Sequence, residues 1–370
     1  MRILHLAFED HRRPNSGGGA VRTHEINRRL AIRHDVTVVT ARYPGCAERV
    51  EDGVRYVHAG ANLGSYGSQL AYYLALPLVL RRRAADLVVE EIAPPFSSGL
   101  VPLWTRRPVV GVVQWLFARE KSRQYHLPFF VVEWLGIRAH HRFIAVSADL
   151  ASRLRSINPR ATVTTIHQGV DARAFDLSSR QRQDVLFLGR MEIAQKGLDL
   201  LVEAFAQIVS HTTAQLLIAG DGPDLERVRA MCRRLGILER VRFLGRVGGR
   251  AKLDLLASVQ LVCMASRYEG FPLVAAEAMA CASPILAFDI PCLREILQAD
   301  AGVLVEAFDV RAYAAAMRAL LEDRDACRTM GDAGRRRARS FDWETAAQRQ
   351  EQVYLDAVNP LPSALVAGER

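Results

Sequence analysis

Lysine is almost absent from this chain of 370 residues, since only Lys121, Lys196 and Lys252 occur among its 49 basic residues. The six cysteines stand singly, with no Cys-x-x-Cys pair, which excludes the usual pattern of a disulfide framework or a structural zinc site. No apolar run approaches the roughly 20 residues that cross a bilayer, and no secretory leader is recognisable before the first strand-like segment. These absences predict a cytoplasmic protein.

The apolar fraction of 50% and charged fraction of 24% are those of an ordinary globular protein. The chain is longer than one hydrophobic core usually organises, so two domains are expected. Short runs of Val, Ile and Leu alternate with helical stretches, the pattern of parallel sheets covered by helices. The expected strands are 3–7, 36–40, 54–58, 87–90, 109–113, 143–146 and 162–166, and then 185–188, 216–219, 241–244, 261–264, 285–287 and 302–305.

The polar stretch 178–184 separates the two sets of strands and is interpreted as a linker. We predict an α/β protein with two tandem Rossmann-like domains, one over 1–170 and one over 171–340. A C-terminal helix and tail over 341–370 should pack back toward the first domain. Because ligands of such sheets bind at the carboxyl ends of the strands, residues directly after each strand are the candidates for a site.

Positive charge is concentrated in the first half of the chain. Residues 1–170 hold 23 Lys and Arg against 13 Asp and Glu, whereas the remainder holds 26 against 27. This excess could attract an acidic partner, a membrane surface or nucleic acid. Taken alone, the composition is better explained by a solvated arginine-rich face.

Three consecutive glycines, Gly17, Gly18 and Gly19, lie between the first strand and a helix expected over 21–33. Glycines let the backbone approach a phosphate, and a helix N-terminus supplies free N–H groups. The spacing is not Gly-x-Gly-x-x-Gly, so a dinucleotide fingerprint is not met. A flexible loop is an equally good interpretation of this motif taken alone.

Two cations follow the first strand of the second half. Arg190 offers a bidentate fork and Lys196 a point charge, in a loop between a strand and a helix. A pair of fixed cations at that position suits a diphosphate, whose departure leaves charge that must be stabilised.

Two carboxylates flank the start of a later helix. Pro272 suits a first helical turn, which places Glu269 in the preceding loop and Glu277 on the helix. A carboxylate on an alanine-rich helix is costly unless a partner satisfies it, and the paired hydroxyls of a ribose or hexose are suitable partners. An ion pair of Glu277 with a neighbouring arginine is the alternative.

Taken in order, these motifs resemble glycosyltransferase family 4. The resemblance covers residues 2–355 and is carried by Gly17-Gly18-Gly19, Gly189-Arg190 with Lys196-Gly197, Ala219-Gly220-Asp221-Gly222-Pro223, and Glu269 and Glu277 within Glu-Gly-Phe-Pro-Leu-Val-x-x-Glu-Ala-Met-Ala. It implies the GT-B fold, in which two Rossmann-like domains face each other across a cleft. It also implies a retaining, metal-independent reaction that uses a nucleotide-sugar donor.

The resemblance also implies roles for single positions. Arg190 and Lys196 would hold the diphosphate, Glu277 the ribose hydroxyls and Glu269 the hydroxyls of the donor sugar. The other donor-site residues implied are Gly17, Gly18, Gly19, Gly222, Arg246, Val247, Gly270, Phe271, Pro272, Leu273 and Val274.

Gln114 stands where family members often carry a histidine. Glutamine can hydrogen-bond a hydroxyl but cannot act as a general base. The implied catalytic group is therefore Glu269, Arg190, Lys196 and Gln114, and the acceptor side would hold His24, Gln114, Trp115 and Arg119.

The predicted function is transfer of a hexose-type sugar from a UDP-sugar, such as UDP-GlcNAc or UDP-glucose, in natural-product or cell-envelope biosynthesis. The acceptor could be a small molecule, anionic, carrier-tethered or lipid-linked at the inner membrane face; no obligatory cofactor, metal or nucleic acid is expected. The alternatives are a sugar-nucleotide epimerase or hydrolase of the same fold, an inactive donor-binding subunit, and a non-catalytic basic protein that binds membranes or nucleic acid.

Overall fold

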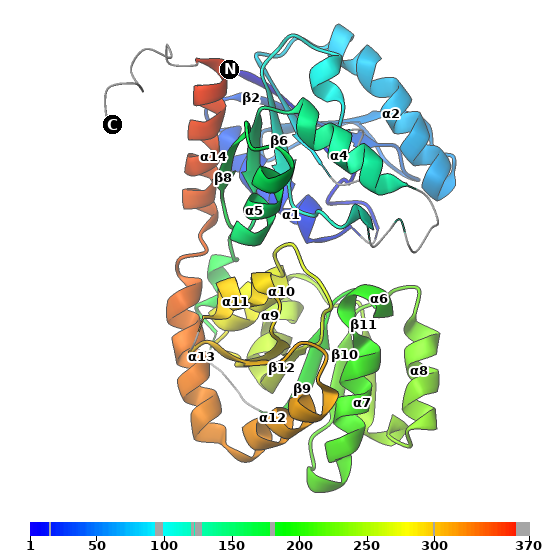
Figure 1. The fold of residues 1–370 in the computed structure, drawn as a ribbon, viewed down its shortest axis with the longest axis vertical. Helices are drawn as coiled ribbons and strands as arrows, with labels where there is room; N and C mark the ends of the chain where they lie inside the picture. Colours follow the sequence, from blue (N-terminus) through cyan, green and yellow to red (C-terminus); the bar gives the residue numbers. More distant parts are fainter. Residues whose placement is uncertain are drawn as a thin grey trace. The chain divides into compact units, whose positions relative to one another are not determined.

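The chain forms an α/β protein with two Rossmann-like domains, as predicted (Figure 1). The structure, a computed structural model, describes residues 1–14, 16–92, 99–119, 122, 128–177, 182–298 and 300–359. It divides into two compact units, Met1–Gln168 with Trp343–Arg370 and Gly169–Asp342. Each unit is built on one sheet whose strands are hydrophobic runs buried between helices.

The first unit holds a sheet in the order β3-β4-β2-β1-β5-β6-β7-β8, parallel except for β3. Strand order reverses at β1, so the carboxyl ends of β1 and β5 mark the switch point at which ligands bind such sheets. The strands are β1 (Arg2–Leu6), β2 (Asp35–Ala41), β3 (Arg49–Glu51), β4 (Val54–Ala59), β5 (Leu87–Glu91), β6 (Val109–Val113), β7 (Arg142–Ala145) and β8 (Thr162–Thr165).

The helices of this unit cover the sheet and include the last helix of the chain. They are α1 (Gly18–Leu30), α2 (Gly64–Arg82), the short 3-10 turn η1 (Val101–Leu103), α4 (Phe129–Ala139), α5 (Ala148–Ile157) and α14 (Trp343–Val358). Helix α14 packs on α1, where the buried Arg22 Nη2 donates to Gln350 Oε1 at 2.7 Å. The tail predicted after α14 lies almost entirely outside the described residues.

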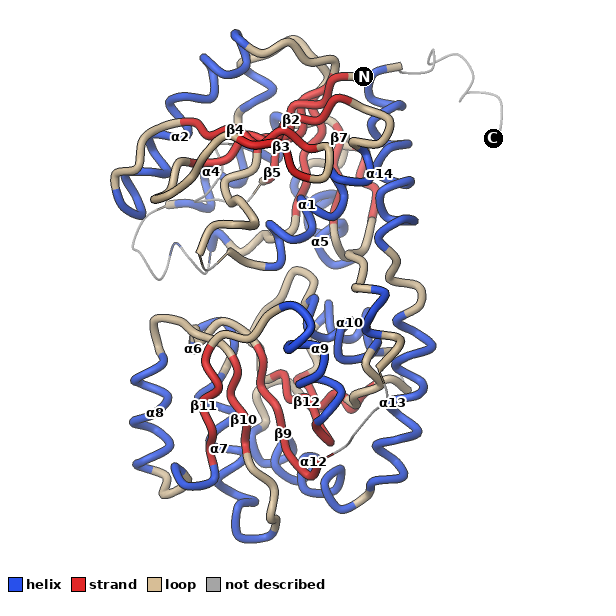
Figure 2. The backbone as a smooth tube through the Cα atoms, turned by 180° about the vertical axis from the view of Figure 1, so that it is seen from behind, coloured by secondary structure: helices blue, strands red, loops and turns tan. Residues whose placement is uncertain are grey.

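The second unit holds a fully parallel sheet in the order β11-β10-β9-β12-β13-β14, with its switch point between β9 and β12 (Figure 2). Its strands are β9 (Arg182–Leu188), β10 (Leu216–Ala219), β11 (Val241–Gly245), β12 (Val259–Met264), β13 (Ile285–Phe288) and β14 (Gly302–Val305). Its helices and 3-10 turns are η2 (Ala172–Ala174), α6 (Ile193–Lys196), α7 (Leu198–Ile208), η3 (Val209–His211), α8 (Leu225–Arg234), η4 (Leu238–Arg240), α9 (Gly249–Ser258), α10 (Leu273–Ala280), α11 (Pro291–Leu297), α12 (Val310–Glu322) and α13 (Arg324–Ala338).

The structure corrects three details of the sequence analysis. Helix α1 spans Gly18–Leu30 and not 21–33, so Gly18 and Gly19 belong to its first turn. Strand β3 was not expected; it forms a hairpin with β4 through Asp52 and Gly53, both at positive φ, as two-residue hairpins require. Of the predicted linker 178–184, residues 178–181 lie outside the described residues, and 182–184 already belong to β9.

Candidate active site

The loops after β9 and β12 lie against each other at the switch point of the second unit. Gly197, which ends the first loop, has a φ of 62°. A Cβ atom added there would lie 1.9 Å from the carbonyl oxygen of Ala265, which begins the second loop. Only glycine permits this approach, so the sequence at 197 allows the two loops to meet.

Lys196 and Glu269, predicted from separate motifs, meet where these loops touch. Lys196 Nζ lies 2.5 Å from Glu269 Oε1, and Ser266 Oγ donates to the same oxygen at 2.7 Å. Glu269 is buried, whereas Lys196 keeps about a fifth of its side chain exposed. The pair places a positive charge and a carboxylate together at the carboxyl ends of the strands.

Arg267 ties the two loops together, a role that sequence reasoning missed. Its guanidinium donates to both carboxylate oxygens of Asp199 on α7, at 2.9 and 2.7 Å, and to the carbonyl oxygen of Ile193 at 2.8 Å. Its backbone N–H donates to the carbonyl oxygen of Gln195 at 2.8 Å. Bidentate arginine pairs of this kind restrict geometry as well as adding energy. The sequence gives no signal that position 199 is the partner.

Glu277 is buried on α10, with only 5% of its surface exposed. Its Oε1 atom pairs with Lys252 Nζ of α9 at 2.5 Å, so its partner is a lysine and not the arginine considered above. Its Oε2 atom is buried and has no hydrogen-bond partner in the part of the chain that the structure describes. Burial raises the pKa of Glu277, and the charge of Lys252 opposes that rise.

Lys252 is therefore a second residue that sequence reasoning missed. The available signal was the scarcity of lysine, because two of three lysines turn out to hold the two carboxylates of the site. The third, Lys121, lies outside the described residues.

The remaining donor-side candidates of this unit also follow strands. Arg190 and Arg246 are exposed after β9 and β11, and Val247 is half-buried. Asp221 Oδ1 accepts from the N–H of Gly222 at 2.8 Å. The segment 270–272 is buried and leads into α10, whose first residues Leu273 and Val274 are half-buried.

In the first unit, Gln114 and the glycine segment lie together. Helix α1 begins at Gly18 with Gly17 as its N-cap, and Gln114 Nε2 donates to the carbonyl oxygen of Gly19 at 3.3 Å. The same nitrogen lies 3.2 Å from Glu91 Oε1, at the end of β5. Because an ionised carboxylate only accepts, Glu91 turns the NH₂ group of Gln114 toward itself. Gln114 Oε1 is left buried without a hydrogen-bond partner among the described residues.

His24 is committed to contacts within its own unit. Its Nδ1 lies 2.8 Å from Tyr56 Oη and its Nε2 lies 3.1 Å from Asp52 Oδ2, while its ring stacks on His11 at 4.0 Å between centroids. Burial lowers the pKa of His24. These contacts explain the presence of His24 by its packing and hydrogen bonding within the first unit.

Trp115 and Arg119 follow Gln114. The Trp115 ring packs edge-on against Phe117 with centroids 5.6 Å apart, and Arg119 is exposed. The acceptor-side roles of these two residues stay predictions.

His11, His24 and Glu51 offer ligand atoms within 4.8 Å of one another. However, Glu51 already accepts from Arg12 at 2.9 Å and from Arg49 at 2.8 Å. Two guanidinium groups at one carboxylate oppose the entry of a cation. This trio therefore gives no support to a metal site.

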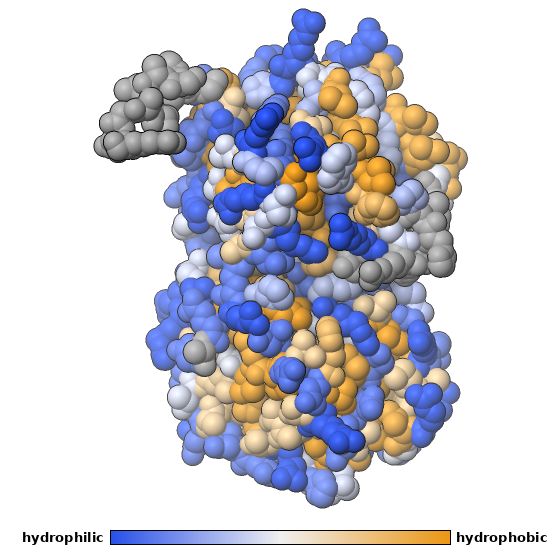
Figure 3. Space-filling model, in the orientation of Figure 1, coloured by the Kyte–Doolittle hydropathy of each residue, from blue (hydrophilic) through white to orange (hydrophobic). Residues whose placement is uncertain are grey.

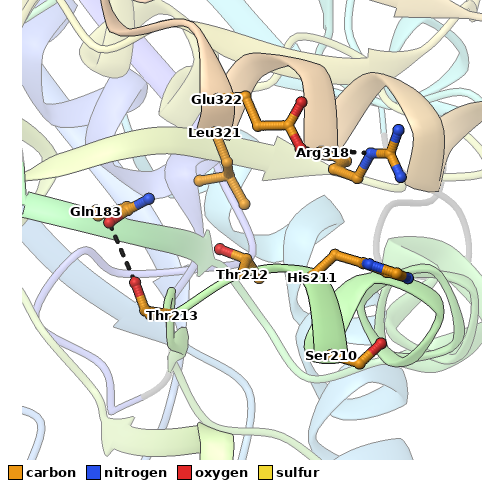
Figure 4. Close-up of a pocket in the computed structure, with 8 residues that line it drawn as sticks. All are labelled: Gln183, Ser210, His211, Thr212, Thr213, Arg318, Leu321 and Glu322. Carbon is orange, nitrogen blue, oxygen red and sulfur yellow. Dashed lines mark hydrogen bonds and ion pairs between the residues drawn. The ribbon is translucent and has the colours of Figure 1, made fainter.

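A separate pocket of about 400 Å³ lies at the opposite edge of the second sheet (Figure 4). The residues that line it lie near the start of β9, just before β10 or near the end of α12: Gln183, Ser210, His211, Thr212, Thr213, Arg318, Leu321 and Glu322. Thr213 Oγ1 donates to Gln183 Oε1 at 3.2 Å across it. The candidate residues follow the carboxyl ends of the strands, whereas this pocket lies where β9 and β10 begin. The pocket is therefore distinct from the candidate site.

Comparison with known proteins bears directly on these two units. Residues 16–174 match the family model described as Glycosyltransferase Family 4, and residues 171–337 match Glycosyl transferases group 1. The phosphatidyl-myo-inositol mannosyltransferase of Mycobacterium leprae is 33% identical over 284 residues, which are 73% of each chain. The glycogen synthase of Mycobacterium tuberculosis is 32% identical over 245 residues, 64% of this chain; the match spans only 58% of the synthase.

Solved structures show the same architecture. Sucrose-phosphate synthase from Thermosynechococcus elongatus aligns over 97% of this chain and all of its own, with a TM-score of 0.84 at 22% identity. The Anabaena protein HepE, in complex with UDP-glucose, aligns over 95% of this chain and 98% of its own, with a TM-score of 0.76 at 21% identity. The chain therefore belongs to glycosyltransferase family 4 and is a glycosyltransferase of the GT-B fold.

Proposed function

We propose that the enzyme transfers a hexose-type sugar from UDP to a hydroxyl or amine acceptor with retention at the anomeric carbon. The observation that carries this proposal is the buried Oε2 atom of Glu277, which has no hydrogen-bond partner among the described residues and lies beside the Lys252 ion pair. A buried acceptor without a donor is costly, so a ligand that supplies hydroxyl donors would be recognised there. The vicinal hydroxyls of a ribose supply such donors.

The charges at the switch point fit the rest of a nucleotide sugar. Arg190 is exposed and Lys196 partly exposed at the edge of the sheet, where a diphosphate would meet both cations. Glu269, held by Lys196 and Ser266, would accept hydrogen bonds from the sugar hydroxyls. The complex of HepE with UDP-glucose supports uridine as the base and a hexose as the sugar.

Gln114 can contribute a hydrogen-bond acceptor to the reaction, but not a general base. Its Oε1 atom, which has no partner in the described part of the chain, would accept a hydrogen bond from a sugar or acceptor hydroxyl, but glutamine cannot take a proton. We infer that the departing phosphate accepts the proton of the acceptor, with Arg190 and Lys196 stabilising its charge.

A thermal-shift panel of nucleoside diphosphates and sugar nucleotides tests the proposal. We expect one UDP-sugar to raise the melting temperature of the wild type by several degrees and to raise that of Lys196→Ala far less. No shift with any sugar nucleotide, in protein with a cooperative melt, would overturn the donor proposal.

A second measurement separates transfer from the alternatives. The selected donor is incubated with the enzyme, with and without acceptor candidates that include a sugar, a glycerol lipid and inositol. A transferase consumes donor rapidly only when an acceptor is present. Equal consumption without acceptor would favour the hydrolase or epimerase.

A further inference from the structure

Helix α2 is apolar on two opposite faces. Tyr72, Leu76 and Leu80 are between 1% and 3% exposed and pack on the first sheet. Leu70, Leu74 and Leu78 are spaced four residues apart along the outer face, and between 49% and 72% of each is exposed. A helix that met only water on its outer face would carry polar residues there.

Helix α4 repeats this feature. Phe130, Val131, Val132, Trp134 and Leu135 are all between 38% and 46% exposed, whereas the inward positions of the helix are buried. In Figure 3, apolar residues gather over α2 and α4 on the face that is shown. Exposed apolar side chains that gather in one patch, unlike single scattered ones, mark a binding surface.

The segment around η1 connects the two helices into one surface. Before η1, Gly99 packs against Gly136 of α4 so closely that a Cβ atom at position 136 would lie 2.8 Å from the Gly99 Cα. After η1, Arg107 Nη1 donates to the carbonyl oxygens of Leu80 and Arg83 at the end of α2, at 3.1 and 2.8 Å. We call the exposed side chains of α2, η1 and α4 with Arg106 the α2–α4 surface.

The charges of the α2–α4 surface are all positive. Arg81, Arg82, Arg106 and Arg138 are exposed, and Arg138 lies over the ring of Trp134 at 4.8 Å. The one acidic residue in the sequences of α2, η1 and α4 is Glu133, which is buried and accepts from the N–H of Ala118 at 3.1 Å. The surface thus combines apolar anchors with arginines and exposes no carboxylate on these elements.

We propose that the α2–α4 surface docks on an anionic lipid bilayer. Its leucines and aromatic rings would enter the boundary between headgroups and acyl chains, while its arginines contact lipid phosphates. A second copy of the chain fits less well, because a two-fold interface would bring the same arginines together without carboxylates to pair them. No helix among the described residues has the length and apolar content to cross the bilayer.

Vesicle co-sedimentation with the full chain tests the proposal, which is independent of the proposed transfer reaction. We expect binding to vesicles of phosphatidylcholine with phosphatidylglycerol, much weaker binding to phosphatidylcholine alone, and weakening by added salt. Arg81→Gln combined with Arg82→Gln should lower the partition coefficient about fivefold for each arginine removed. The matched control removes the same charge from the other unit: Arg227→Gln combined with Arg233→Gln, at two exposed positions of α8, should bind as the wild type does.

The apolar contribution is tested separately. Leu70→Gln combined with Leu74→Gln should lower binding to the anionic vesicles at least tenfold, because two exposed leucines leave the contact. Ile32→Gln, an 81% exposed residue outside the surface, is the matched control and should have no effect. Trp134 should also give a blue-shifted fluorescence on vesicle addition that is absent in Trp134→Phe.

Three results would overturn the proposal. The first is failure of the folded wild type to bind anionic vesicles at low salt. The second is an equal loss of binding in the control variants, which would indicate attraction by net charge alone. The third is a leucine variant that changes the oligomeric state in light scattering but binds vesicles normally, because the surface would then be an interface between copies.

Discussion

At the scale of single residues, each of the two carboxylates of the candidate site forms an ion pair with its own lysine. Lys196 pairs with the loop carboxylate Glu269, and Lys252 pairs with the helix carboxylate Glu277. Breaking a buried pair by removing one partner is costly, because the other charge stays buried. Each lysine therefore acts partly through the carboxylate that it holds.

Replacement of Lys252 by methionine should move the pH dependence of UDP binding. Without the opposing charge, the pKa of Glu277, already raised by burial, rises further. Binding that uses the ionised carboxylate is lost as the pH falls through this pKa, so the loss should begin at a higher pH than in the wild type. Titration calorimetry over a pH series measures this shift. Lys252→Arg, which keeps the charge, is the control, and identical profiles for wild type and Lys252→Met would contradict the account.

Replacement of Glu91 by glutamine should disturb Gln114 without removing it. The new amide at position 91 could turn either its oxygen or its NH₂ group toward Gln114. The orientation of the Gln114 amide, and with it the position of Oε1, would then no longer be fixed. We expect a fall in kcat of about tenfold, the value of one hydrogen bond, with unchanged UDP affinity. Steady-state kinetics beside Glu48→Gln, an exposed residue of the same unit, checks this. A change in UDP affinity with constant kcat would refute the role given to Glu91.

At this scale the sequence indicates candidate residues for the site but not the residues that pair with them. Glu269, Glu277 and Lys196 stand in recognisable motifs after strands. The pairing of Arg267 with Asp199, and of Lys252 with Glu277, joins different elements and depends on tertiary packing. Local sequence carries no signal for such pairs.

At the scale of elements, the buried strands were predictable because each is a short apolar run between helical segments. The antiparallel β3 was missed because three residues are too few to show a period, although Asp52-Gly53 is a hairpin signal. The start of β9 was mistaken for linker because its first residues, 182–184, are polar. Edge and terminal positions of strands face water and lose the apolar signature.

The contact of the β9 and β12 loops gives a prediction at this scale. Gly197→Ala should destabilise the second unit by about 3 kcal/mol or more, because the new Cβ atom would lie 1.9 Å from the Ala265 carbonyl oxygen. Gly236→Ala is the matched control: its φ is 69°, but no atom of the described residues lies within 4 Å of its Cβ position. It should cost only about 1 kcal/mol, the strain of the left-handed backbone. Urea unfolding that gave both variants the same loss would contradict the close approach.

At the scale of the whole molecule, each unit has its own sheet, parallel apart from β3 of the first unit, and candidate residues lie at the switch point of each sheet. Gln114 and Glu91 follow β6 and end β5 in the first unit, and the two lysine–glutamate pairs belong to the second. The excess of positive charge in residues 1–170 is visible in the sequence. The sequence does not show that exposed leucines of α2 and α4 accompany this charge. Which side chains of a helix are buried depends on the face of that helix that packs on the sheet.

The central claim is that Glu277 recognises a nucleotide donor, and calorimetric titration with UDP tests it most directly. We predict that UDP binds the wild type and binds Glu277→Ala about 10- to 100-fold more weakly, the loss of a hydrogen bond to a charged group. Glu226→Ala, which removes an exposed glutamate of α8, should bind UDP as the wild type does. Equal UDP affinity in Glu277→Ala and the wild type, or no binding by the folded wild type, would contradict the claim.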